Sequence, residues 1–210
     1  VYCMTVDSNH RFALINGVIS KNCEGDSAAG VIARPRDRKT QAILPLRGKI
    51  QNVSGMSIKD ALHHETVANI INSLGAGVGD SADPKKCRYE RIIISTDADP
   101  DGQHIVALIL TALVNLVPPI VKAGMVYLLD PPLYKYEVGN EVKYTSNFEE
   151  VPSNAKHFIR FKGLGAMEDE DFKNTCLNKE NRTLYQVSYP DDIDYFNTIS
   201  GPSWGRSELL

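Results

Sequence analysis

The chain has 210 residues, of which 42% are hydrophobic and 23% charged, and its formal net charge is −3 at pH 7. These values are typical of a globular chain of one or two domains and exclude a global basic field, so any contact with nucleic acid needs a local basic patch. The cysteines are far apart and form no CxxC pair, which implies neither a disulfide framework nor a zinc site and fits a reducing cytoplasm. The chain starts at Val1 rather than methionine, so we expect that an upstream portion was lost or processed.

Residues 1–22 alternate apolar and polar side chains in two short runs, with a turn favoured at Asn16-Gly17. The next stretch, CEGDSAAG from Cys23 to Gly30, reads as an acidic glycine turn before a helix start. Such a turn should follow an apolar strand, but here it follows Ser20-Lys21-Asn22. The mismatch indicates a junction between two unrelated pieces.

Two basic stretches come next. The first is a predicted basic loop over residues 34–39, and the second is PLRGKIQNV, residues 45–53, with Arg47 and Lys49 beside a glycine. A solvated surface loop is the alternative interpretation of such runs.

The remaining elements alternate between helix and strand. We predict a helix over residues 57–74 that ends at the glycines of 75–79, a buried strand at 92–94 and a buried helix within 105–121. That apolar run is too short and too interrupted to span a membrane. A strand at 125–129, a hairpin formed by 133–138 and 141–144, and a second basic glycine loop at 162–165 follow. This alternation predicts an α/β fold with a largely parallel sheet.

Three carboxylates follow the isoleucine strand at every second position, in the order Asp97, Asp99 and Asp101. Ligand sites of parallel sheets lie outside the carboxyl ends of the strands, and closely spaced like charges repel unless a cation lies among them. Oxygen ligands of this kind suit Mg²⁺. An acidic turn that caps a helix beginning near Gly102 is the alternative.

Several motifs in consistent order carry a family resemblance. CEGDSA, QAILPLRGKIQNV, IISTDADPDGQHI, PPLYKY, RFKGLGAM and NRTLYQV resemble the C-terminal half of the B subunit of type IIA DNA topoisomerases, the family of gyrase B and topoisomerase IV B. The resemblance implies a toprim domain over residues 23–125, with a mostly parallel sheet flanked by helices, and a small α+β region over 126–210. It covers the chain from Glu24 nearly to the end.

The family's functional residues transfer position by position. The implied catalytic and metal-binding acids, for two Mg²⁺ ions, are Glu24, Asp97 and Asp99, with Asp101 as a third, outer metal-binding acid. The implied DNA-binding positions are Lys49 and Asn52, with Arg47 and Lys162 as further basic candidates. In the family, Ala166 is usually a glutamate, so no catalytic role is given to the glycine loop before it.

The resemblance also implies partners. These are double-stranded DNA, an A subunit that carries the nucleophilic tyrosine, and an upstream B-subunit fragment whose ATPase domain uses ATP, with no membrane involved. A shorter segment before Arg160 favours a compact phage-type subunit, in the cytoplasm of a bacterial or phage-infected cell. A toprim nuclease or primase, or a non-catalytic DNA-binding or assembly module, are the alternatives.

Residues 1–22 resemble a different family. VYCMTVDSNHRFALING and VISKNC are similar to the C-terminal blocks of an intein, which implies a short all-β remnant and a splicing set of His10, Asn22 and Cys23. Asparagine can attack its own carbonyl carbon, and a cysteine thiolate is a good acyl acceptor. Lys21 and Cys3 depart from the usual intein residues, and a decorative hairpin is the alternative. Because intein sequence takes the place of the strand before Glu24, we predict a gap at the centre of the sheet.

Overall fold

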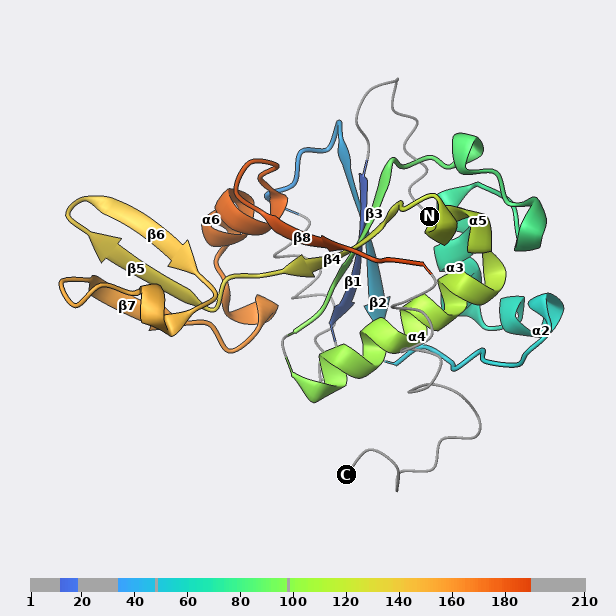
Figure 1. The fold of residues 1–210 in the computed structure, drawn as a ribbon, viewed down its shortest axis with the longest axis horizontal. Coiled ribbons are helices and arrows are strands. Elements are labelled where there is room, and N and C mark those ends of the chain that lie inside the picture. Colours follow the sequence, from blue (N-terminus) through green and yellow to red (C-terminus); the bar gives the residue numbers. More distant parts are fainter. Residues whose placement is uncertain (1–11, 19–33, 48, 98, 190–210) are drawn as a thin grey trace.

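The computed structural model describes residues 12–18, 34–47, 49–97 and 99–189, and its centre is a twisted five-stranded sheet (Figure 1). The strands lie in the order β2-β1-β3-β4-β8. Among the described strands, β2, β1, β3 and β4 run parallel to one another, and β8 runs antiparallel to β4. The bounds are β1 Phe12–Val18, β2 Gln41–Arg47, β3 Arg91–Ser95, β4 Val126–Asp130 and β8 Thr183–Gln186. The predicted α/β class with a mostly parallel sheet is confirmed.

The strand β1 corrects the predicted gap. It pairs in parallel with β2 on one side and with β3 on the other, with Leu14 level with Ile43 and Ile93. The centre of the sheet is therefore filled, because an extended segment there satisfies the backbone groups of both neighbours. The rest of the expected all-β remnant of residues 1–22 lies outside the described residues.

Three strands were not predicted from the sequence: β2, which was interpreted in part as a basic stretch, the strand β7, Lys156–Arg160, and β8. β2 contains Pro45, which cannot donate a backbone hydrogen bond, but β2 pairs only with β1 and is an edge strand. Proline is tolerated at such an edge. β8 is short and mostly exposed, so no apolar periodicity marks it.

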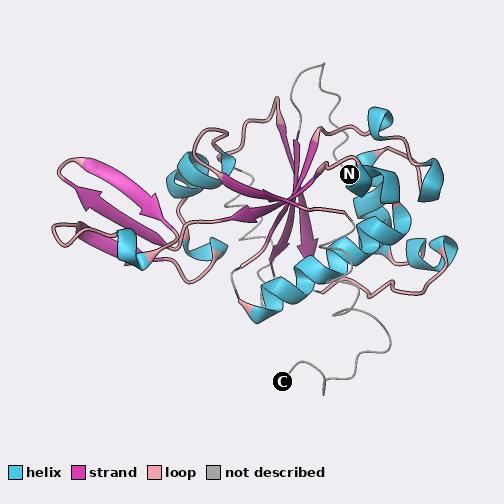
Figure 2. Cartoon of the chain, in the orientation of Figure 1, coloured by secondary structure: helices cyan, strands magenta, loops and turns pink. Residues whose placement is uncertain are grey.

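Four helices cover one face of the sheet (Figure 2): α2 Ile58–Leu62, α3 Glu65–Leu74, α4 Pro100–Leu116 and α5 Pro118–Lys122. They bury a core that includes Ile92, Ile94 and Val126 from the sheet. The predicted helix over 57–74 is two helices, because His64 is extended and begins α3 as its N-cap. Its predicted apolar face and its glycine stop are confirmed, since Gly75 caps α3 in the left-handed conformation.

A smaller core lies on the other face of the sheet. Ile93 of β3 and Leu129 of β4 pack there with Phe161, Leu164 and Phe172. Phe161 and Leu164 belong to the 162–165 loop and its surroundings, and Phe172 ends the helix α6, Asp169–Phe172. Cys176 and Leu177 of the following π-helical turn, Lys173–Leu177, belong to the same cluster. The two faces of β3 thus belong to two different clusters.

A three-stranded antiparallel sheet projects from one end of the molecule, away from α2–α5 (Figure 1). It consists of the predicted hairpin, β5 Tyr134–Val138 and β6 Glu141–Thr145, and of β7 Lys156–Arg160 on the other side of β5. With α6 it forms the predicted small α+β region. Short 3-10 turns connect the remaining elements at Gly79–Ser81, Pro84–Lys86, Phe148–Glu150 and Leu164–Ala166.

No helix within the described ranges combines the length and the apolar character needed to cross a bilayer.

Candidate functional site

Two of the predicted acids lie just beyond the carboxyl end of β3. Asp97 follows the buried residues Ser95 and Thr96 and is half-buried, whereas Asp99 is exposed and is the N-cap of α4. The Oδ1 atom of Asp99 accepts a hydrogen bond of 2.6 Å from the backbone N–H of Gly102. The strand and the start of α4 therefore hold both carboxylates at one edge of the parallel sheet, as the sequence predicts.

The acidic turn also begins the helix α4. The alternative interpretation, an acidic turn that caps a helix, is therefore correct for Asp99. Asp99 caps α4 and Pro100 occupies the first turn, where its missing N–H costs nothing. One oxygen of Asp99 is used in this way, and within the described part of the chain its Oδ2 accepts no hydrogen bond. Capping and metal binding are compatible, because they use different oxygens.

The second glycine loop closes on Asp97 from a distant part of the chain. The backbone N–H of Leu164 donates a 2.7 Å hydrogen bond to Asp97 Oδ1. Gly163 is so close that a β-carbon added there would lie 2.8 Å from the same oxygen. The sequence interpretation gave this loop a DNA-binding candidate, Lys162, but no contact with the acids, and the repeated glycines beside Lys162 are the signal that could have pointed to such a contact.

The predicted DNA-binding lysine contacts the outer acid. Lys49 Nζ lies 2.9 Å from Asp101 Oδ1, and the two side chains are 45% and 51% exposed. At this exposure the pair is well solvated, so both groups remain accessible to a competing phosphate or cation.

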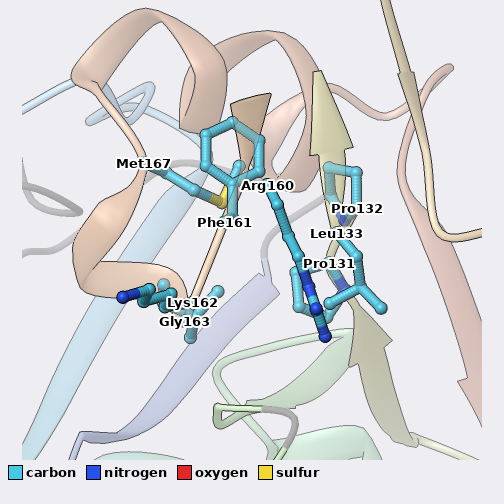
Figure 3. A pocket seen from close by; sticks show the side chains of 9 residues that line it. Pro131, Pro132, Leu133, Arg160, Phe161, Lys162, Gly163 and Met167 are labelled. Atoms are coloured by element: carbon cyan, nitrogen blue, oxygen red, sulfur yellow. The ribbon is translucent and has the colours of Figure 1, made fainter. Parts of the chain in front are cut away.

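The other predicted DNA-binding residues are Asn52, Arg47 and Lys162. Asn52 is exposed, and its Oδ1 accepts a hydrogen bond from the backbone N–H of Ser54. Arg47 is the last residue of β2, at the carboxyl edge of the sheet. Exposed Lys162 flanks a cavity of about 330 Å³ together with Arg160, and Figure 3 shows their side chains leaving the chain in different directions.

The remaining predicted site residues, Glu24, His10, Asn22 and Cys23, lie outside the described residues. Among those that are described, no three histidine, cysteine, aspartate or glutamate side chains form a group that could hold a metal ion. The donors that are present nevertheless suit Mg²⁺, which is usually bound by one or two carboxylates and completes its octahedron with waters and phosphates.

A buried ionic network joins the three-stranded sheet to α6. Asp171 of α6 is 2% exposed and lies 2.6 Å from Lys135 Nζ of β5, and it accepts a 2.8 Å hydrogen bond from the hydroxyl of Tyr144 of β6. Burial acts to raise the pKa of Asp171, but the hydrogen bonds from Lys135, Tyr144 and the Glu168 backbone outweigh it, and the pKa is lowered. Burial and the contact with this carboxylate raise the pKa of Tyr144. The network joins the hairpin to α6 as a charged, hydrogen-bonded unit.

Comparison with known proteins agrees with this geometry. Residues 23–130 match the Toprim domain family, and residues 154–201 match the family described as DNA gyrase B subunit, carboxyl terminus. The chain is 41% identical over 184 residues to the DNA gyrase B subunit of Staphylococcus epidermidis, an alignment that covers 84% of this chain and 29% of the relative. It is 40% identical over 193 residues to the DNA gyrase B subunit of Haloferax volcanii, covering 87% and 30%. The chain therefore spans less than a third of the length of these relatives.

Proposed function

Because the chain belongs to the Toprim family, as the toprim region of a type IIA DNA topoisomerase B subunit, we propose that it supplies the Mg²⁺-binding and DNA-binding residues for double-strand cleavage and religation. The observation that carries this proposal is the position of Asp97 and Asp99 directly after a buried parallel strand. A site at this edge is open to a large substrate such as a duplex.

Glu24, Asp97 and Asp99 would hold Mg²⁺, with Asp101 as the outer acid. Bound there as a pair, the ions would stabilise the charge on the attacking and leaving oxygens of a phosphoryl transfer. Glu24 would exchange a proton with the 3′ oxygen of the broken strand, since a carboxylate within hydrogen-bond reach can act as a general acid or base. The chain's own contribution is to hold these carboxylates at the end of a rigid strand.

Lys49, Asn52, Arg47 and Lys162 would bind the phosphate backbone of the duplex. Such contacts fix the position of DNA without reading its sequence. The contact of Lys49 with Asp101 supports a shared location for the two roles, because it places the lysine 2.9 Å from the outer acid.

The complete reaction needs parts that this chain does not supply. In the proposal an A subunit provides the nucleophilic tyrosine, and an upstream B-subunit fragment provides the ATPase domain, all in the cytoplasm.

We further propose that residues 1–22 are the C-terminal part of an intein and that splicing joins Cys23 to an upstream fragment, with His10 and Asn22 assisting. The strand β1, Phe12–Val18, lies in the segment that this reaction would remove. The upstream fragment must therefore bring a replacement strand for the position between β2 and β3. The domain boundary proposed at 22/23 follows from this scheme, and the one proposed at 125/126 follows from the toprim resemblance.

The test of the metal role compares Asp97→Asn with Asp80→Asn in the spliced protein, assembled with a matching A subunit. Asp80 is an exposed acid in the turn Gly79–Ser81, outside the acidic turn after β3. We expect DNA cleavage to be lost in the first variant and kept in the second, while both remain folded. Unchanged cleavage by Asp97→Asn would exclude a catalytic role for this acid.

The test of DNA contact compares Lys49→Ala with Lys59→Ala, an exposed lysine of α2. Loss of one phosphate contact should weaken binding to all duplex sequences about equally and reduce the slope of log affinity against log salt by about 1. A changed sequence preference with an unaltered slope would point to a different role for Lys49.

The test of splicing mixes the chain with an upstream fragment that carries the complementary intein piece. Ligation with loss of residues 1–22, together with a gain of Mg²⁺-dependent cleavage when an A subunit is added, is expected. Full cleavage activity from an unspliced Asn22→Ala, Cys23→Ala chain would contradict the need for strand replacement.

A further inference from the structure

We propose that Gly163 and Leu164 position the carboxylate of Asp97 for metal binding, and that the missing side chain at Gly163 is what makes this possible. The inference rests on the proposed metal role of Asp97. It assigns a positioning role to backbone atoms of a loop that lies far from Asp97 in the sequence.

The contact with Leu164 is a directed one. The Leu164 N–H donates to Asp97 Oδ1 at 2.7 Å, across 67 positions of sequence. The side chain of Leu164 is 1% exposed and packs with Ile93, Phe161 and Phe172, so the donor is fixed to the body of the molecule. A hydrogen bond from a backbone N–H to an ionised carboxylate is stronger than one between neutral groups.

The contact with Gly163 is steric. A β-carbon at this position would lie 2.8 Å from Asp97 Oδ1, 2.9 Å from Cγ and 3.2 Å from Oδ2. The backbone of Gly163 is extended, with φ 160° and ψ 176°, a conformation that other residues adopt as well. The requirement for glycine is therefore one of space around the carboxylate and not one of backbone strain.

Asp97 is also confined at its backbone. A β-carbon at Gly102 would lie 2.0 Å from the backbone oxygen of Asp97, so the start of α4 packs directly on the main chain of Asp97. Two glycines thus enclose the aspartate, one at its backbone and one at its side chain. Within the described residues Oδ2 accepts no hydrogen bond, and we assign this oxygen to the ion while the loop holds Oδ1.

The experiment replaces Gly163 by Ala in the full chain, with Gly165→Ala as the matched control. A β-carbon at Gly165 would have nothing within 4 Å, so the control adds the same methyl group to the same loop without touching Asp97. Mn²⁺ is the probe, because its affinity can be measured by calorimetry or by the loss of the free-ion EPR signal, without DNA or cleavage. We expect Gly163→Ala to weaken Mn²⁺ binding by about 10-fold or more, the usual effect of disturbing a group that orients a metal ligand, and Gly165→Ala to change it by less than about 2-fold.

Asp97→Ala provides the second arm. With the carboxylate removed, the added methyl group at position 163 meets no obstacle, so Gly163→Ala should lower Tm in the wild-type background and leave it unchanged in the Asp97→Ala background. This arm is measured without metal. Two results would overturn the positioning role. The first is an equal Tm shift in both backgrounds. The second is an equal Mn²⁺ affinity for Gly163→Ala and Gly165→Ala when Asp97→Ala weakens binding.

The two proposals fail in distinguishable ways. If Asp97→Ala leaves Mn²⁺ affinity unchanged, the metal role of Asp97 is wrong, and the positioning of Asp97 for a metal falls with it. If Asp97→Ala abolishes Mn²⁺ binding and Gly163→Ala does not alter it, the metal role stands and only the positioning role is lost.

Discussion

The two sheets of this molecule are stabilised in different ways. In the five-stranded sheet the isoleucines of β3 are at most 1% exposed, because helices cover one face and the loop around Leu164 covers the other. In the three-stranded sheet every residue of β7 is exposed, including Ile159 at 48%. The first sheet has two apolar cores against its faces, and the second has almost none of its own.

This difference shows how stability and positioning are divided. The buried sheet supplies a rigid strand for Asp97, whereas the exposed sheet leads through β7 into Lys162 and the loop that holds Asp97. The exposed sheet is joined to the body through the polar network of Asp171 and through a hydrogen bond from the Phe161 N–H to the Leu133 carbonyl. A substitution in the core of the five-stranded sheet should therefore lower the free energy of unfolding. A substitution in the three-stranded sheet should mainly displace the 162–165 loop.

The largest effect is expected from a cavity in the buried sheet. Ile94→Ala removes three buried carbon atoms from a side chain that is 1% exposed, and should cost about 3 kcal/mol of unfolding free energy. The matched change Ile159→Ala in β7 should cost less than about 0.5 kcal/mol, because that side chain is already half in water. Urea unfolding measures both, and similar costs for the two variants would refute the contrast between the sheets.

The next largest effect concerns the network at α6. Asp171→Asn removes the charge that balances Lys135, whose side chain is only 21% exposed, and should cost about 2 kcal/mol at pH 7. Asp169→Asn, which alters a half-exposed acid in the same helix, is the control and should have a much smaller effect. Urea unfolding gives the two free energies. An equal loss in both variants would mean that the network stabilises the fold no more than an exposed acid of the same helix does.

The cost of Asp171→Asn should also depend on pH. The pKa of Asp171 is lower in the folded than in the unfolded chain, so the unfolded chain takes up its proton first as the solution becomes acidic. The stabilisation is complete above the unfolded pKa of about 3.9 and is lost as the pH falls through the lower, folded value. The difference between wild type and variant should therefore shrink below about pH 4, and a difference that stays constant down to pH 2 would contradict the lowered pKa.

The two sheets also differ in how far they could be predicted from sequence. The isoleucines of β3 and the long apolar run of α4 gave strong signals, and the hairpin was marked by Gly139-Asn140. β2 was missed because residues 45–53 were interpreted from their basic side chains, and its edge position, which makes Pro45 acceptable in a strand, is a property of the whole sheet. The predicted gap at the centre of the sheet was wrong. Residues Phe12–Val18 were assigned to an intein remnant on the basis of resemblance, and their ability to pair as a strand with β2 and β3 was not considered.

The same limit applies to the candidate site. The position of Asp97 and Asp99 at the end of a buried strand could be predicted from a local motif, because the isoleucine run and the acids follow each other directly in the sequence. The contact between Asp97 and Leu164 could not be predicted from the sequence. The two residues are 67 positions apart, and Leu164 contributes only its backbone N–H. Backbone donors leave no trace in residue type, apart from the glycine that makes room for them.

A smaller effect is expected from the aromatic cluster on the exposed sheet. The rings of Tyr134, Phe148 and Phe158 have centroids 5.5–5.8 Å apart, although Phe158 is 45% exposed. Phe158→Ala should cost about 1 kcal/mol, because ring–ring contacts add to a modest burial. Val142→Ala on β6, at 46% exposure, is the control and should cost less. Equal costs in urea unfolding would show that the three rings do not stabilise the sheet as a cluster.

The smallest effect concerns the ion pair at the edge of the buried sheet, where Lys49 meets Asp101 at 2.9 Å. Both side chains are about half exposed, so water and salt screen their attraction, and a double-mutant cycle of Lys49→Ala with Asp101→Asn should give a coupling energy below about 1 kcal/mol. The coupling should fall further when the salt concentration is raised from 0.05 to about 1 M, where the Debye length is about 3 Å. A coupling above about 2 kcal/mol that resists salt would show that the pair is a structural link like that of Asp171. In that case Lys49 would be too tightly held to serve DNA, and the weak coupling expected here is what leaves the lysine available to a phosphate.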